Sequence, residues 1–197
     1  MTGSGKTEIL GALRNMGEQV LDLEALANHR GSSFGALGQP PQPTNEQFWN
    51  TIAMEWVKFD STKALWVEAE SKSLGLCRIP QEIFEQMEKA IVIEISRSRQ
   101  ERVEFLVEIY GDANINDLIA ATERIRKRLG GMGAQKAVDF GREGNLAAAS
   151  DLILHYYDKT YTYDLEKRGG CIHKVNISGL SNVDAAVLVQ QKSQEIL

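Results

Sequence analysis

Short runs rich in apolar residues alternate along the chain with longer segments in which apolar and polar positions mix. An apolar run of about four to eight residues, bounded by glycine or polar residues, is typical of a buried strand. Such runs predict strands over 19–23, 64–67, 90–95 and 172–177. Strands that alternate with helices predict an α/β fold.

The segments between these strands carry the end signals of helices. Thr44 with Gln47, and Ser181 with Asp184, have the spacing of helix caps, and Pro80 suits a first helical turn. We predict helices over 8–14, 45–59, 81–89, 98–110, 116–129, 134–140 and 145–160, and from 181 onward. Three of the four prolines lie within 28–46, which predicts a loop there. The run of helices before the last strand predicts one domain, 1–197, with a helical insertion over 97–170.

The first seven residues contain the end of a phosphate-binding loop. Its pattern is G-x-x-x-x-G-K-[ST], and Gly5, Lys6 and Thr7 match the last three fixed positions. Gly3, Ser4 and Gly5 would turn backbone N–H groups toward a phosphate, Lys6 would reach its outer oxygens, and Thr7 would place its hydroxyl on Mg²⁺. The plain alternative is a glycine-rich tail that contains Gly-Lys-Thr by chance.

A phosphate-binding loop ordinarily follows a strand that lies inside the sheet. No such strand precedes the loop in this sequence. We therefore expect a P-loop NTPase-like, three-layer α/β fold with a parallel sheet, whose first strand is missing and whose helical insertion precedes the last strand. We also expect this chain to be less stable than a form that carries the upstream strand.

Polar residues follow three of the predicted strands, at the edge where α/β sheets bind ligands. After the first strand, Arg30 could clamp a phosphate or diphosphate, and His29 could act as an acid–base group or hydrogen-bond donor. After the second, Glu68, with Glu70 nearby, could hold Mg²⁺ through water or orient Arg30. After the third, Arg97 could neutralise phosphate. The alternatives are a structural loop, a surface carboxylate pair and ordinary ion pairs.

Composition narrows the class of protein. The chain has 197 residues, of which 43% are hydrophobic and 25% charged, the balance of a soluble globular domain. No window approaches the roughly 18–20 apolar residues that span a bilayer, and no signal peptide is visible, so we expect no membrane partner. Cys77 and Cys171 cannot form a disulfide framework, which indicates a reducing, cytoplasmic compartment. They have no zinc-ligand spacing with the histidines, so we predict no zinc site.

Charge is distributed unevenly. The net charge of −5 argues against nonspecific nucleic-acid binding by the whole surface. Six basic residues and one acidic residue nevertheless lie between 124 and 142, a local charge of +5 that leaves −10 on the rest of the chain. The basic residues are Arg124, Arg126, Lys127, Arg128, Lys136 and Arg142. On composition alone, a solvated helix face is the simpler explanation.

One stretch of the sequence indicates a particular protein family more specifically than a phosphate-loop pattern can. It reads Asp22-Leu23-Glu24, Leu26-Ala27-Asn28-His29-Arg30-Gly31-Ser32-Ser33-Phe34-Gly35, Pro41-Gln42-Pro43 and Glu46-Gln47-Phe48, followed by Trp66-Val67-Glu68-Ala69-Glu70-Ser71, Gly75 and Ile79-Pro80. This stretch resembles the tRNA 2-selenouridine synthase family. The resemblance covers essentially the whole chain, but only the C-terminal, P-loop half of the family's protein.

The resemblance implies an enzyme that replaces sulfur by selenium in wobble 2-thiouridine of tRNA, with selenophosphate as donor, and that can also geranylate this sulfur from geranyl diphosphate. It implies that the phosphate loop holds selenophosphate, geranyl diphosphate or a nucleotide, with Mg²⁺, and that the six basic residues bind tRNA. The family's rhodanese domain, with its cysteine, is absent here, so a rhodanese domain would act upstream in cis or in trans. The alternatives are a P-loop small-molecule kinase and a non-catalytic tRNA-binding module that serves a separate rhodanese protein.

Overall fold

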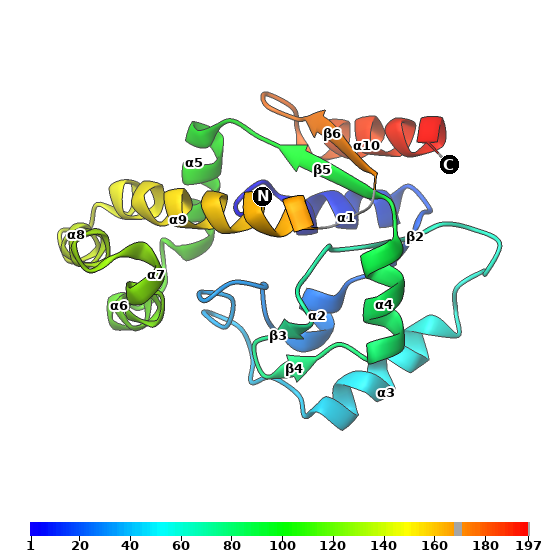
Figure 1. The fold of residues 1–197 in the computed structure, drawn as a ribbon, viewed down its shortest axis with the longest axis horizontal. Helices are drawn as coiled ribbons and strands as arrows, with labels where there is room; N and C mark the ends of the chain where they lie inside the picture. The colour runs from blue at the N-terminus through cyan, green and yellow to red at the C-terminus, as the bar shows by residue number, and fades with distance from the viewer. Residues whose placement is uncertain (168–170, 197) are drawn as a thin grey trace.

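The computed structural model describes residues 1–167 and 171–196, with only the backbone described over 164–167. Its strands are short, and they are β1 (Gln19–Leu21), β2 (Leu65–Val67), β3 (Ser73–Leu74), β4 (Cys77–Arg78), β5 (Val92–Ser96) and β6 (Ile172–Asn176). Its helices are α1 (Lys6–Asn15), α2 (Leu23–Ala27), α3 (Asn45–Trp56), α4 (Gln81–Lys89), α5 (Arg99–Tyr110), α6 (Ile115–Arg124), α7 (Arg126–Leu129), α8 (Gly131–Arg142), α9 (Leu146–Lys167) and α10 (Asn182–Ile196). Figure 1 shows their arrangement.

The strands form parallel pairs, which confirms an α/β fold. β1 pairs with β2, with Val20 opposite Trp66, and β5 pairs with β6, with Glu94 opposite Lys174. β3 and β4 form a small antiparallel hairpin that the sequence did not predict. The strands predicted over 19–23, 64–67, 90–95 and 172–177 are all present with slightly different bounds.

Most predicted helices are present, and several end signals act as expected. Thr44 accepts a hydrogen bond from the backbone N–H of Gln47, and Ser181 accepts one from that of Asp184. Two predictions were wrong. The helix over 116–129 is divided into α6 and α7, and the glycines of 131–133 begin α8 instead of linking two helices. Tertiary packing overrides the low helix propensity of glycine here, because Ala134 and Val138 of α8 are buried.

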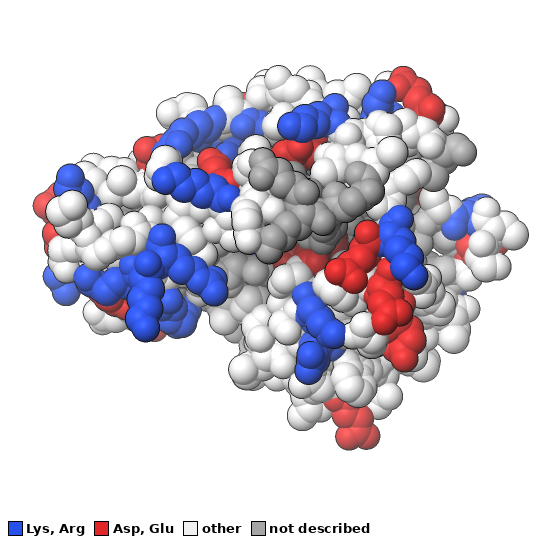
Figure 2. All heavy atoms as spheres, viewed as in Figure 1, with Lys and Arg blue, Asp and Glu red and all other residues white. Residues whose placement is uncertain are grey.

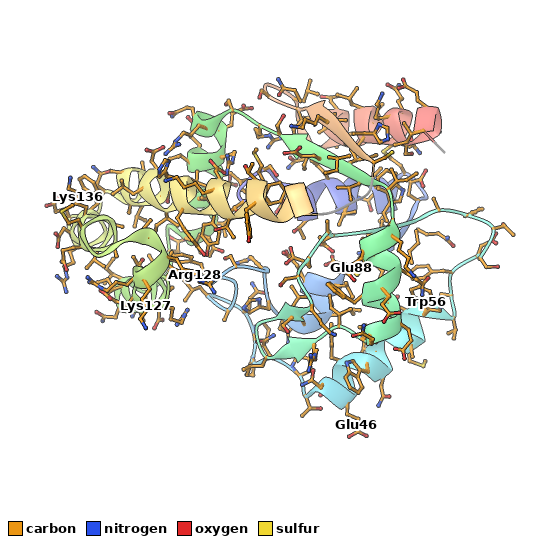
Figure 3. The ribbon with its side chains drawn as sticks, viewed as in Figure 1. Glu46, Trp56, Glu88, Lys127, Arg128 and Lys136 are labelled. Atoms are coloured by element: carbon orange, nitrogen blue, oxygen red, sulfur yellow. The ribbon has the colours of Figure 1, made fainter. Side chains whose placement is uncertain are left out.

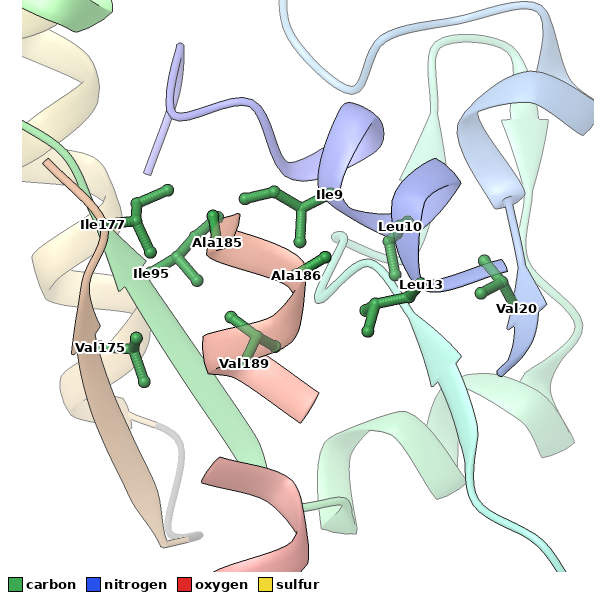
Figure 4. Close-up of a cluster of buried hydrophobic side chains, with 10 residues drawn as sticks. All are labelled: Ile9, Leu10, Leu13, Val20, Ile95, Val175, Ile177, Ala185, Ala186 and Val189. Carbon is green, nitrogen blue, oxygen red and sulfur yellow. The ribbon is translucent and has the colours of Figure 1, made fainter. Parts of the chain in front are cut away.

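The core next to the phosphate loop joins α1 to α10 and to strands from both parallel pairs. Figure 4 shows Leu13 of α1 and Val189 of α10 in this cluster, with Val20 of β1 and Ile95 of β5. Burial of these side chains fixes α1, and therefore the loop before it, against the ends of the strands.

The helices α5–α9 follow β5 and precede β6 in the chain. They form a separate helical lobe on one side of the molecule in Figure 1. The helices of the lobe fall within 97–170, where the sequence predicted a helical insertion, and 168–170 lie outside the described residues. The lobe has its own core, built around Phe34, Ala121, Ile125 and Tyr156. Phe34 comes from the loop after α2, so this loop is packed into the lobe.

A groove separates the two parallel pairs. Within the described residues, β2 pairs with no strand other than β1, and β5 pairs with no strand other than β6. The groove has a volume of about 440 Å³ and is lined largely by apolar side chains of α1, α10, β2 and β5. No helix in the described part of the chain is both long and apolar enough to cross a membrane.

Candidate functional site

The phosphate loop turns sharply before α1. Gly3 and Gly5 have φ values of 72° and 76°, which glycine adopts without strain. The hydroxyl of buried Ser4 donates to the carbonyl of Met1 over 2.7 Å, and Lys6 Nζ donates to the same carbonyl over 3.4 Å. The loop therefore curls in front of the N-terminus of a ten-residue helix, where free N–H groups and the helix dipole favour an anion.

Thr7 is bonded to a carboxylate that sequence reasoning did not select. Its hydroxyl donates to Glu24 Oε2 over 3.0 Å, and Glu24 is only 7% exposed in the first turn of α2, directly after β1. Burial, and then the neighbouring charge of Glu70, raises the pKa of Glu24 to about 7. A charged residue immediately after a buried strand was the sequence signal that could have identified it.

Glu24 and Glu70 converge beneath a glycine. A Cβ built on Gly31 would lie 2.7 Å from Glu24 Oε1 and 2.7 Å from Glu70 Oε2. Gly31 also has a φ of 68°. Both the conformation and the close approach therefore require glycine at this position.

Glu68, the predicted catalytic carboxylate, is 2% exposed. Both of its oxygens are buried without a hydrogen-bond partner in the described part of the chain. Burial, and then the charges of Asp22 and Glu24, raises its pKa to about 8. A carboxyl group with this pKa is mostly protonated at neutral pH.

His29 is buried in the loop of residues 29–37, which we call the site loop. Its Nδ1 has no partner among the described residues, and its ring lies against Gly35 and Gly75, where a Cβ would come within 3 Å. Burial lowers the pKa of His29, which favours the neutral imidazole.

Arg30 is held inside its own loop. Its Nη1 donates to the carbonyl of Leu37 over 3.2 Å, and its guanidinium lies 5.9 Å from the ring centre of Tyr110. No hydrogen bond among the described residues joins Arg30 to the phosphate loop. That Arg30 clamps a phosphate stays a prediction.

Arg97, predicted to bind phosphate, lies beside the phosphate loop. Its Nη1 is 3.5 Å from the position that a Cβ on Gly5 would take. Its Nη2 donates to the carbonyl of Leu180 and to Oδ1 of Asn182, over 3.2 and 3.3 Å. The start of α10 thus holds this guanidinium at the loop.

Arg102 of α5 is buried, and its Nε donates to the carbonyl of Thr2 over 2.8 Å. Nη2 pairs with Asp158 of α9 over 2.6 Å. Arg102 therefore ties the helical lobe to the backbone of the phosphate loop.

The predicted tRNA-binding residues lie on α6, α7 and α8 of the lobe, and we call them the basic surface. They are Arg124, Arg126, Lys127, Arg128, Lys136 and Arg142. Figure 2 shows a group of basic side chains over this part of the molecule, and Figure 3 labels Lys127, Arg128 and Lys136.

The members of the basic surface differ in their contacts. Lys127 and Lys136 are exposed and have no side-chain partner among the residues that the structure describes. Arg126 pairs with Glu123, and Arg142 lies 3.9 Å from Asp139. These two pairs lower the charge that the surface offers to phosphates.

Two arginines of the basic surface point to protein groups. Arg128 Nη1 donates to the hydroxyl of Tyr156 over 3.3 Å. Arg124 Nη2 donates to the carbonyl of Ser33 in the site loop over 2.7 Å.

The described residues contain no group of three or more His, Cys, Asp and Glu side chains that could hold a metal ion. Thr7 and Glu24 nevertheless offer a hydroxyl and a carboxylate beside the phosphate loop. These donors suit Mg²⁺, which is usually bound by one or two carboxylates together with substrate phosphates.

Comparison with known proteins gives a consistent result. The sequence model of a family described as tRNA 2-selenouridine synthase AAA domain matches residues 1–193. Proteins named tRNA 2-selenouridine synthase are similar to this chain: one from Marinobacter nauticus is 32% identical over 86% of this chain and 53% of its own length. One from Pseudomonas syringae is 33% identical (87% and 54%), and one from Hydrogenovibrio crunogenus is 33% identical (93% and 55%). The chain thus spans about half the length of these relatives. No solved structure matches it.

Proposed function

This chain belongs to the tRNA 2-selenouridine synthase family through its AAA domain, and from this membership we propose that it is the phosphate-binding and tRNA-binding part of such an enzyme. It would act in the replacement of sulfur by selenium, and in geranylation, at wobble 2-thiouridine of tRNA. The observation that carries the proposal is the convergence of Lys6, Thr7 and Arg97 at the N-terminus of α1.

In this proposal the phosphate loop, Gly3 to Thr7, and Arg97 bind the phosphate or diphosphate of a ligand. Mg²⁺ would be held by the Thr7 hydroxyl and would neutralise phosphate charge. His29 and Glu68 are the proposed catalytic residues, because both are buried and both carry an unpartnered polar atom. Arg30 is the third proposed catalytic residue: its Nη1 donates to the carbonyl of Leu37, and its remaining guanidinium N–H groups would bind phosphate.

The surroundings of the phosphate loop bear on the choice of ligand. An apolar cavity of about 60 Å³ lies inside the helical lobe and reaches Thr2 of the phosphate loop and Ser32 of the site loop. Phe34, Leu106 and Tyr110 line its apolar wall. Among selenophosphate, geranyl diphosphate and a nucleotide, only geranyl diphosphate carries an apolar chain that would suit this wall, although the cavity is too small to enclose the whole chain. Competition of each compound against inorganic diphosphate would rank them.

We propose that β1–β2 and β5–β6 are parts of one parallel sheet, the middle layer of a three-layer α/β fold. The groove between β2 and β5 is the place for one further parallel strand, because both strands run parallel to their partners and face a common apolar space. A synthetic five-residue strand peptide rich in valine and isoleucine should raise the midpoint of thermal unfolding. A peptide of the same composition with a central proline should not.

The proposed partners are tRNA and a rhodanese domain, which would supply the selenium-step cysteine in cis or in trans. Among the described residues no observation favours the kinase alternative. A non-catalytic tRNA-binding module that serves a separate rhodanese protein would share the same basic surface. ATP turnover that needs no tRNA would support the kinase instead.

Binding measurements test the proposal. We expect the chain to bind inorganic diphosphate by calorimetry, and Lys6→Ala to weaken this binding about tenfold or more, since Lys6 supplies a charge-assisted contact. Lys58→Ala is the matched control, because Lys58 pairs with Glu55 next to α3. Unchanged diphosphate binding in Lys6→Ala would contradict the proposal. The chain should also bind a tRNA transcript in filter assays.

A further inference from the structure

The site loop has two sides with different neighbours. Its inner side carries His29 and Gly31, and Gly31 lies against the carboxylates of Glu24 and Glu70. Its outer side carries Ser33 and Phe34, which contact the helical lobe. The loop therefore connects the carboxylates beside Thr7 to the lobe that bears the basic surface.

Side chains of the lobe bond both backbone groups of Ser33. The carbonyl accepts a hydrogen bond from Arg124 Nη2 over 2.7 Å, and the N–H donates to the hydroxyl of Tyr157 over 3.1 Å. The next side chain, Phe34, is 6% exposed in the lobe core, with its ring 6.1 Å from that of Tyr110. This outer side is thus held at several points.

The same guanidinium acts on the buried imidazole of the loop. Burial lowers the pKa of His29, the charge of Arg124 lowers it further, and the charge of Glu70 raises it. Glu70 and Arg124 are the charged groups that act on His29, while Gly35 and Gly75 pack against its ring.

We propose that Arg124 is a positioning residue of the candidate site. Its guanidinium fixes Ser33, and with it the position of the site loop over Glu24 and Glu70. Arg124 would therefore hold the loop and would not make the contact with a tRNA phosphate that its place in the basic surface suggests. Its importance for ligand binding rests on the proposed function. Arg124 ends α6, and Lys127 follows in α7, so one short segment bears both a loop contact and an exposed lysine. A tRNA held at Lys127 would therefore lie three residues along the chain from the side chain that holds the site loop.

The test compares Arg124→Gln with Arg126→Gln, the same change two residues away, where the guanidinium pairs with Glu123. The chain has three histidines, so the ring signal of His29 can be followed by NMR. We expect Arg124→Gln to raise the pKa of His29 and to weaken binding of inorganic diphosphate by about tenfold, the size of one charge-assisted hydrogen bond. Affinity for a tRNA transcript should change less than in Lys127→Ala.

Two further variants keep the test decisive if Arg124→Gln folds poorly. Arg124→Lys retains the charge, so the pKa of His29 should stay close to that of the unmodified chain while diphosphate affinity falls. Tyr157→Phe removes the other bond to Ser33 and should also weaken diphosphate binding. An unchanged pKa of His29 in Arg124→Gln, together with a loss of tRNA affinity equal to that in Lys127→Ala, would overturn the inference.

The inference and the proposed function fail separately. If the unmodified chain did not bind diphosphate, the proposed function would fail, while the pKa of His29 would still report on Arg124. If diphosphate bound and Lys6→Ala abolished binding, but Arg124→Gln changed neither the pKa of His29 nor diphosphate affinity, only the positioning role would be lost.

Discussion

The hydroxyl of Thr7 donates to Glu24 Oε2 over 3.0 Å, so the first turn of α1 is joined directly to the first turn of α2, which follows β1. In phosphate-binding loops this hydroxyl is the group that contacts Mg²⁺. The bond therefore places Glu24 where it can hold a cation, directly or through water, together with the phosphates of a ligand.

We expect Glu24→Gln to reduce the gain in diphosphate affinity that Mg²⁺ provides, because an amide oxygen carries no charge to balance the cation. Calorimetry with and without Mg²⁺ would measure the difference. Glu88→Gln on α4, an exposed position labelled in Figure 3, serves as control. An equal Mg²⁺ effect in all three proteins would exclude Glu24 from the cation site.

Replacing Gly31 should disturb the site more than replacing Gly38. Both residues have a positive φ, 68° and 67°, so alanine costs about 1–2 kcal/mol of backbone strain at either position. Only Gly31 also faces the carboxylates of Glu24 and Glu70, whereas a Cβ on Gly38 meets nothing within 4 Å. Gly31→Ala should therefore unfold at lower urea concentration than Gly38→Ala and bind diphosphate more weakly. Equal midpoints would show that the close approach is easily relieved.

The stability of the chain should fall as pH rises from 5 to 8. The pKa of Glu68 is near 4.5 when unfolded and about 8 when folded, so in this window the folded state retains a proton that the unfolded state has lost. The free energy of unfolding then decreases by up to about 1.4 kcal/mol per pH unit. Stability from this group is complete below pH 4.5 and is lost as pH rises toward 8.

Glu68→Gln should flatten this dependence, because the amide does not titrate. Urea unfolding in the presence of a chelator, at each pH, gives the slope. Glu46→Gln at the exposed start of α3 should leave the slope as it is. A slope that persists in Glu68→Gln would assign the dependence to Glu24 or another group.

Arg102 and Arg99 lie on the same helix and pair with aspartates on the same partner helix, α9, yet their environments differ. The Arg102 side chain is 4% exposed and that of Arg99 is 46% exposed. Removing one partner of a buried pair typically costs about 3–5 kcal/mol, whereas an exposed pair contributes about 0–1 kcal/mol. Arg102→Leu should therefore destabilise the chain far more than Arg99→Leu in urea unfolding. Similar losses of stability in the two variants would mean that water readily solvates Asp158 once its arginine is removed.

Binding of tRNA should weaken with salt, and the exposed lysines should account for part of this dependence. Each phosphate contact contributes roughly 0.7–0.9 to the slope of log affinity against log salt. Lys127→Ala and Lys136→Ala should each reduce the slope by about this amount in filter binding, with Lys58→Ala as control. Slopes identical to that of the unmodified chain would remove these lysines from the interface.

Local pattern was enough to predict the main strands, the start of α3 at Thr44 and the start of α5 at Ser98, since each depends on residues close in sequence. The β3–β4 hairpin has strands of two residues, too short for any periodicity to register. The short helix α2 begins almost directly after β1, and its first residue, Leu23, was included in the strand predicted over 19–23.

The candidate site likewise contains residues that local sequence could predict and contacts that it could not. Gly5, Lys6 and Thr7 follow one contiguous pattern, and Arg97 follows a strand end, so sequence could select them. The bond from Arg124 to Ser33 joins residues 91 apart, and that from Arg102 to Thr2 joins residues 100 apart. Such contacts depend on how helices pack, which local pattern does not report.

The groove between β2 and β5 has a consequence for handling the protein. Two strands whose outer backbone groups are not hydrogen-bonded to any described strand face an apolar space, and exposed strand edges of this kind are templates for pairing with other chains. At high concentration the chain should therefore self-associate through this groove. A peptide that occupies the groove would act as a solubilising agent, so light scattering would record its binding as a loss of aggregates.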